Sequence, residues 1–152
     1  MKVRIRKVTK NDWEFILKLR NQESSRLSFH DTSIIDWDTH VSYMNKITNK
    51  STDHHWIVLS DNKEVGYIKI VNNVFGSNLL DGYRRKGIGS TAYKLVFEEA
   101  KKLGFKKLTA EVKVDRPIPL TFEEKTGWKK IKLIYKNKKP YSYKIEKTLD
   151  IL

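Results

Sequence analysis

Hydrophobic and polar positions in the first third of the chain predict one strand and two helices. Residues 3–8 alternate aliphatic and charged side chains, which is typical of a strand with one buried face. Thr9 and Asp12 have the spacing of an N-terminal capping box, and apolar residues then recur at helical spacing to Gln22. After a polar stretch with no regular pattern, Asp36 is predicted to open a second helix. Its expected apolar face comprises Trp37, Val41, Met44 and Ile47.

The rest of the chain reads as strands separated by turns, with one long helix among them. Asn72-Asn73 is a predicted turn or bulge, and Gly104 is suited to the left-handed position after the long helix, which spans 88–103. A short helix is predicted from Pro117 to near Gly127. The predicted strands are 55–60, 65–71, 74–80, 107–114, 128–135 and 141–147. This order indicates one mixed α/β (α+β) domain over residues 1–152.

Composition removes several classes of function. The 152 residues include no cysteine, which excludes a disulfide framework, a thiolate nucleophile and a cysteine-based zinc site. The four histidines are too few for a metal-ligand pattern, and the adjacent pair His54-His55 would point to opposite faces of a strand, so no metal is expected. No apolar run approaches the roughly 18 residues of a membrane helix, and the alternating start is unlike a signal peptide. We therefore expect a cytoplasmic protein without a membrane segment.

Net charge is the compositional feature that asks for an explanation. The chain has 31 Lys and Arg against 18 Asp and Glu, a formal charge of +13. Most of this surplus lies after residue 100, where 15 basic residues face 6 acidic ones. Such a charge is typical of proteins that meet nucleic acid, an anionic membrane or a phosphorylated ligand, and a lysine-rich solvated surface is the alternative.

A glycine-rich basic loop carries the clearest chemistry. Arg84-x-x-Gly87-x-Gly89 lies between a predicted strand and the long helix. Unpaired N–H groups and the dipole at a helix start favour an anion, and glycines let the backbone approach it closely. A dinucleotide fingerprint would need a third glycine where Ala92 stands, and the Walker A ending Gly-Lys-Ser/Thr is absent. The loop is therefore predicted to bind a pyrophosphate.

The segments around this loop resemble a known family. Tyr-Arg-Arg-Lys-Gly-Ile-Gly-Ser at 83–90, the amphipathic helix after it, and Phe-Glu-Glu-Lys-Thr-Gly-Trp at 122–128 resemble the GNAT N-acetyltransferase superfamily. That resemblance implies a central mixed, mostly antiparallel sheet with a splayed parallel strand pair and about four helices. It also implies acetyl-CoA as cosubstrate, with direct attack of an amine on the thioester and no acyl-enzyme.

The resemblance assigns cofactor contacts residue by residue. Backbone groups of Leu79 and Leu80 would hold the pantetheine arm, between strands that end near Leu80 and Val114. The pyrophosphate would be bound by Arg84, Arg85, Lys86, Gly87, Ile88, Gly89 and Ser90.

The N-terminal half resembles the branch that acetylates amino-sugar nucleotides, including those of pseudaminic acid synthesis. The resemblance rests on Arg20-Asn21 and on Thr39-His40. It implies that Arg20 and His40 face the nucleotide phosphates, with Lys69 at the acceptor site. The pocket for the sugar or base would be lined by Phe29, His30 and Tyr43. Each of these side chains also has a plain structural alternative, such as an ion pair between Arg20 and Glu23.

Glu111 is our candidate general base, acting directly or through water, because this branch carries a glutamate on the strand flanking the splay. An ion pair with a surface lysine is the alternative. Two positions depart from the family: Glu123 replaces the usual tyrosine that protonates the thiolate, and Arg116 replaces an asparagine.

Other acceptors and another class of protein remain open from the sequence. The same fold could acetylate a protein N-terminus, a ribosomal protein or an aminoglycoside. A basic nucleic-acid-binding module is the non-enzyme alternative, although no nucleic-acid motif with interleaved aromatic residues is present. The sequence is compatible with a monomer and with a homodimer.

Overall fold

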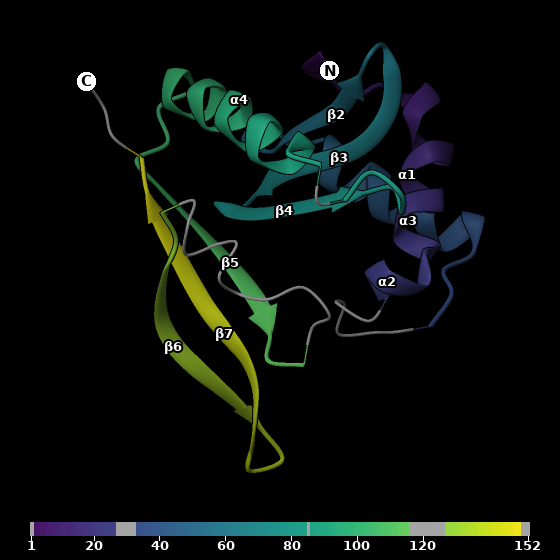
Figure 1. The fold of residues 1–152 in the computed structure, drawn as a ribbon. Coiled ribbons are helices and arrows are strands. Elements are labelled where there is room, and N and C mark those ends of the chain that lie inside the picture. The colour runs from purple at the N-terminus through teal and green to yellow at the C-terminus, as the bar shows by residue number, and fades with distance from the viewer. Residues whose placement is uncertain (1, 27–32, 85, 116–126, 150–152) are drawn as a thin grey trace.

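A seven-stranded sheet organises the protein, seen in a computed structural model that describes residues 2–26, 33–84, 86–115 and 127–149. The strand order is β1-β2-β3-β4-β5-β7-β6, and β4 with β5 is the parallel pair (Figure 1). The other neighbours in the sheet pair antiparallel. The strands are β1 (Val3–Lys7), β2 (His54–Ser60), β3 (Lys63–Val71), β4 (Val74–Leu79), β5 (Lys107–Lys113), β6 (Lys129–Lys136) and β7 (Lys139–Thr148).

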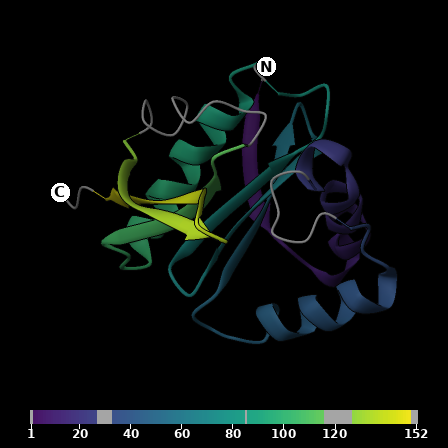
Figure 2. The same ribbon diagram turned by 90° about the horizontal axis from the view of Figure 1, so that it is seen from below.

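Helices cover both faces of the sheet (Figure 2). They are α1 (Trp13–Asn21), α2 (Glu23–Arg26), α3 (Trp37–Thr48) and α4 (Ile88–Lys102), with a 3₁₀ turn, η1 (Lys10–Asp12), before α1. Because side chains alternate along a strand, neighbouring residues of β2 enter different cores. Val58 packs in the core beneath α4, whereas Ile57 packs in the core with α1 and α3.

The predicted fold class is confirmed: a single-domain α+β fold with a mixed sheet and one parallel pair. Pairs of residues with positive φ close the hairpins, as at Asn72 and Asn73 (φ 53° and 65°), which is the turn geometry that asparagine tolerates. Gly104 has the expected left-handed conformation (φ 95°). The short helix predicted from Pro117 lies outside the described residues. In the described part of the chain, no helix has both the length and the apolarity needed to cross a membrane.

Two local predictions were wrong. The stretch after the first helix, expected to be irregular, contains α2, whose Ser24 and Ser25 hydrogen-bond to β4 and the loop after it. Trp37, expected on a buried helix face, is 48% exposed. Its ring lies 6.0 Å from the ring of His40, and His40 is the residue that enters the core instead. An aromatic residue at the first turn of a helix can extend beyond the core that later turns contact.

Acid is expected to weaken the fold through Asp12. Its carboxylate accepts two 2.8 Å hydrogen bonds from Arg6 and one from the Thr9 amide, and the Arg6 bond lowers the pKa of Asp12. A lowered folded-state pKa gives stability that is complete above the unfolded value, about 3.9, and is lost as pH falls through the folded value. Chemical denaturation should show Asp12→Asn costing about 2 kcal/mol at pH 7 and much less at pH 2. An equal cost at both pH values would contradict this linkage.

Candidate active site

The start of α4 has a geometry that suits the predicted anion cradle. Gly87 is the N-cap residue with φ 80°, and a Cβ built there meets no atom within 4 Å. Thr91 N–H donates to the Gly87 carbonyl, so the amides at the start of the helix precede the hydrogen-bonded ladder. The first turn carries no acidic residue, and Lys86 lies beside it with its ammonium 5.8 Å from the ring of Tyr83. Space, open amides and helix dipole together suit an anion.

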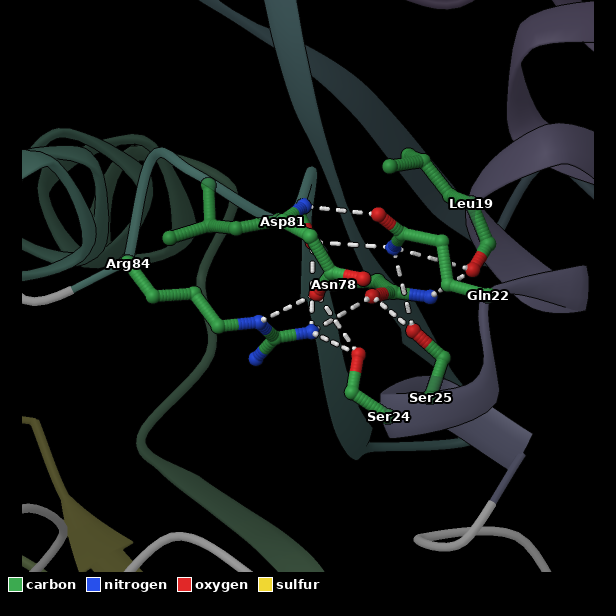
Figure 3. Close-up of polar contacts among 8 residues, drawn as sticks. Leu19, Gln22, Ser24, Ser25, Asn78, Asp81 and Arg84 are labelled. Atoms are coloured by element: carbon green, nitrogen blue, oxygen red, sulfur yellow. Dashed lines mark hydrogen bonds and ion pairs between the residues drawn. The ribbon is translucent and has the colours of Figure 1, made fainter.

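The sequence predicts that Arg84 binds the pyrophosphate, but in the structure its side chain points away from the start of α4. Figure 3 shows its guanidinium turned toward β4 and α2. Nη2 donates to the Leu79 carbonyl at 3.2 Å, and Nε lies 3.4 Å from an oxygen of Asp81. The guanidinium therefore joins the base of the loop to the end of β4, because carbonyl and carboxylate acceptors are grouped there by the fold. Arg85 lies outside the described residues.

A splay between β4 and β5 opens beside the cradle. Among the described residues the two strands pair at Val74 and Thr109 alone, and Figure 1 shows them diverging from there. Because alternate residues of β4 are hydrogen-bonded to β3, those between them direct their backbone groups toward β5. Past the pairing point these residues are Phe75, Ser77 and Leu79. Such an edge suits an extended ligand with amide groups, such as pantetheine.

The predicted pantetheine contact at Leu80 needs correction, whereas the N–H of Leu79 stays on the edge of β4 that faces the splay. Leu80 N–H donates to Val65 O at 2.8 Å, so it belongs to the β3–β4 ladder. The Leu79 carbonyl already accepts hydrogen bonds from Gln22 (3.0 Å) and Arg84 (3.2 Å). In this structure protein groups hold these atoms, and the edge between Phe75 and Leu79 is the part of β4 that faces the splay.

Four predicted acceptor residues meet on the opposite side of the sheet from α4. Arg20 lies over the ring of Tyr43, with Cζ 4.5 Å from its centroid. Lys69 Nζ donates to the Tyr43 hydroxyl at 2.6 Å and lies 5.0 Å from the ring. Arg20 also donates to Nδ1 of His40 at 3.0 Å. Phe29 and His30, predicted beside them, lie outside the described residues.

His40 supports this cluster rather than lining its surface. Its side chain is fully buried. Because Arg20 is a donor only, Nδ1 accepts, so Nε2–H donates to the Trp13 carbonyl at 2.7 Å. Burial lowers the pKa of His40, which keeps the imidazole neutral. Both nitrogens are therefore engaged within the protein, and the expected contact between His40 and a phosphate does not fit this geometry.

The cluster is cationic and partly withdrawn from solvent. Burial lowers the pKa of Arg20, and among the described residues no carboxylate forms an ion pair with Arg20 or Lys69. Beneath it, Tyr67 is buried and its hydroxyl bonds Nδ1 of His55 at 2.7 Å. Burial raises the pKa of Tyr67 far above its usual range, so it stays neutral. Two cations without a described counter-charge favour an anionic guest.

Glu111 lies on β5, across the splay from this cluster. It is exposed and stands directly opposite Lys144 on β7. It lines a groove of about 230 Å³ with Val74 and Thr109. Lys69 lies on the same face of the sheet as this groove. Val74, which lines the groove, and Gly76 share that face of β4 because side chains alternate along a strand, and Lys69 Cε lies 3.2 Å from the position that a Cβ on Gly76 would take. Glu111 and the cationic cluster thus flank one region, whereas Glu123 and Arg116 lie outside the described residues.

Comparisons with solved structures agree with this arrangement at the level of fold. The protein is similar to spermidine N-acetyltransferase from Vibrio cholerae in complex with CoA and spermine (TM-score 0.82, 15% identity, covering 97% of this chain and 95% of that one). It is also similar to a domain from Methanocaldococcus jannaschii DSM 2661 (0.83, 23%, 97% and 99%). A third similar structure is ribosomal-protein-alanine N-acetyltransferase from Brucella melitensis (0.78, 16%, 96% and 99%).

Sequence comparison identifies the family. No curated protein matches the chain. The sequence profile of the Acetyltransferase (GNAT) family matches residues 13–127, a span that contains α1, α3, the splay and the cradle. These are the elements on which the geometry above depends. The chain therefore belongs to the GNAT acetyltransferase family and is an N-acetyltransferase that uses acetyl-CoA.

Proposed function

We propose that this enzyme acetylates the primary amine of a small acceptor that carries an anionic group, and that a nucleotide-linked amino sugar is the acceptor. The observation that carries the proposal is the cluster of Arg20 and Lys69 around Tyr43. Both cations lie on the sheet face that the groove of Glu111 shares. A diphosphate would replace the solvent that these cations lose on burial, and the ring of Tyr43 would pack against a sugar or base.

The described residues suggest a division of labour during transfer. The amides at the start of α4 bind the pyrophosphate, and the free edge of β4 holds the pantetheine amides and the thioester carbonyl. The amine attacks that carbonyl, a C–N bond forms and the C–S bond breaks as the thiolate leaves. Glu111 accepts the proton of the attacking amine, directly or through water. A backbone N–H of β4 stabilises the oxyanion. Positioning supplies most of the remaining acceleration.

A polyamine fits this site poorly. The V. cholerae neighbour is named for spermidine, a cation at neutral pH. Arg20 and Lys69 would repel such an acceptor. This repulsion is stronger than in bulk water because the site is partly withdrawn from solvent, as the lowered pKa of the buried Arg20 indicates. The fold is shared, but the charge of the acceptor-side cluster favours an acceptor of opposite sign.

Neutralising either cation is expected to weaken acceptor binding. Arg20→Met or Lys69→Met should raise KM for an amino-sugar nucleotide about tenfold, since one hydrogen bond to a charged group is lost. KM for acetyl-CoA should stay within about twofold, because the cradle lies at the start of α4. Steady-state assays of CoA release measure both constants. Lys18→Met, which removes an exposed cation from α1, is the matched control, and equal effects of all three changes would contradict the assignment.

A further inference from the structure

The last three side chains of the α1 region contact three different parts of the protein. Arg20 contacts His40 and Tyr43 of α3. Asn21 bonds the backbone of Ile35, just before α3. Gln22 bonds the backbone where β4 ends. The end of α1 therefore joins the acceptor-side elements to the strand that leads into the cradle.

The carboxamide of Gln22 pairs with β4 as a neighbouring strand would. Its Oε1 accepts from Asp81 N–H at 2.7 Å and its Nε2 donates to Leu79 O at 3.0 Å. In a parallel sheet, a residue of one strand hydrogen-bonds to the carbonyl before and to the amide after the residue that faces it on the next strand. Gln22 contacts the carbonyl before and the amide after Leu80, and the N–H of Leu80 itself bonds β3 on the other side. Gln22 thus extends the sheet by one peptide-like group beyond the splay.

Neighbouring contacts tie the same junction to α1 and α2 (Figure 3). Asn78 donates to the Leu19 carbonyl at 3.1 Å and accepts from Ser25 at 2.7 Å. Ser24 donates to Asp81 at 2.7 Å. Arg84 then bonds Leu79 and Asp81 from the loop that leads to Gly87. Direct hydrogen bonds therefore connect α1 and α2 to Arg84, three residues before Gly87 in the chain.

We propose that Gln22 is a positioning residue that fixes the end of β4 and the cradle relative to the helix that carries Arg20. The expected effect of Gln22 on KM rests on the proposed function, whereas its effect on the order of the loop at 81–84 rests on the hydrogen-bond geometry alone. Without the carboxamide, Asp81 N–H loses its acceptor and Leu79 O keeps Arg84 only. The loop at 81–84 is then less constrained, and cofactor binding has to order it.

Asn21 offers a control of the same chemistry on the adjacent residue. Its Nδ2 donates to Ile35 O at 2.9 Å, and its Oδ1 accepts from Ile35 N–H at 2.8 Å. This clamp has the same two hydrogen bonds as that of Gln22, yet it holds the segment before α3. Removing it takes two hydrogen bonds from the end of α1 without touching β4, whereas Gln22 Nε2 also lies 3.2 Å from Leu19 O and from Ser25 Oγ.

Steady-state kinetics of Gln22→Met and Asn21→Leu test the proposal. Gln22→Met should raise KM for acetyl-CoA about tenfold, the size of one or two lost hydrogen bonds, with kcat within about threefold of wild type. Asn21→Leu should leave KM for acetyl-CoA within about twofold, even where its melting temperature falls. An unchanged KM in Gln22→Met, or an equal rise in both variants, would overturn the proposal.

Amide hydrogen exchange of the cofactor-free protein separates this inference from the proposed function. Gln22→Met should speed exchange of the Asp81 amide by about tenfold, and Asn21→Leu should leave it unchanged. If wild type turns over no acceptor while the exchange result holds, the acceptor assignment fails and the positioning role stands. If exchange at Asp81 is the same in wild type and Gln22→Met, the positioning role fails whatever the activity.

Discussion

Gly87→Trp is expected to abolish measurable acetyl-CoA binding, a loss of about 100-fold or more. Two effects combine. A side chain at φ 80° strains the backbone by about 1–2 kcal/mol, and an indole would fill the open space beside the first amides of α4. Because a Cβ there meets no atom within 4 Å, the new side chain starts in open space. Isothermal titration calorimetry with acetyl-CoA measures the effect.

Gly104→Trp is the matched control for this loss. Gly104 has φ 95° and the same open space, but it lies just beyond the other end of the helix. It should lose a similar amount of stability and bind acetyl-CoA as wild type does. Wild-type affinity in Gly87→Trp, or equal loss in both variants, would show that the start of α4 is not the pyrophosphate site.

Glu111→Gln should lower kcat about 100-fold or more, which is the usual contribution of a positioned general base. The dissociation constant for acetyl-CoA should not change, since the cradle lies on another element. Glu146→Gln provides the comparison, because Glu146 is a carboxylate on the adjacent strand that forms an ion pair with Lys107 at 3.1 Å. Single-turnover measurements isolate the chemical step. A kcat equal in the two variants would assign Glu111 to the ion-pair role instead.

Local sequence patterns were sufficient for the features that depend on local physics. Period-two alternation marked the first strand, paired asparagines marked a tight hairpin, and Gly87 marked the start of α4. The cluster of Arg20, Tyr43 and Lys69 was grouped by resemblance, and the structure brings these three together. The prediction that Trp37 is buried was wrong, because helical spacing places a residue on one face of a helix without showing how far the core beneath that face extends.

Contacts between distant segments could not be found in the same way. Gln22 and Leu79 are 57 residues apart, and a single glutamine after Arg-Asn forms no recognisable pattern. The direction of Arg84 depends on Asn78 and Asp81, whose acceptors meet it only after β4 is folded against α2. Sequence therefore placed a basic glycine loop before α4 but could not place the guanidinium of Arg84 against Leu79 and Asp81.

The basic surplus after residue 100 has a partial structural explanation. Two lysines of the β6–β7 hairpin lie over tyrosine rings: Lys130 Nζ is 4.7 Å from the ring centroid of Tyr143, and Lys136 Nζ is 5.0 Å from that of Tyr141. Their aliphatic stems cover apolar surface while the charges stay solvated. Family membership also favours the enzyme over a nucleic-acid-binding module. The acceptor-side cations of the proposed function are Arg20 and Lys69, which contribute little to the total of +13.

Measuring which acceptor charge the enzyme prefers tests most directly whether Arg20 and Lys69 bind an anionic acceptor. Initial rates of CoA release should be compared for an amino-sugar nucleotide, the same amino sugar without its nucleotide, and spermidine. We predict that kcat/KM for the nucleotide-linked sugar exceeds both others by about tenfold or more, and that Arg20→Met removes most of this advantage. A higher kcat/KM for spermidine, or no difference between the two sugars, would contradict the assignment of Arg20 and Lys69 to an anionic acceptor.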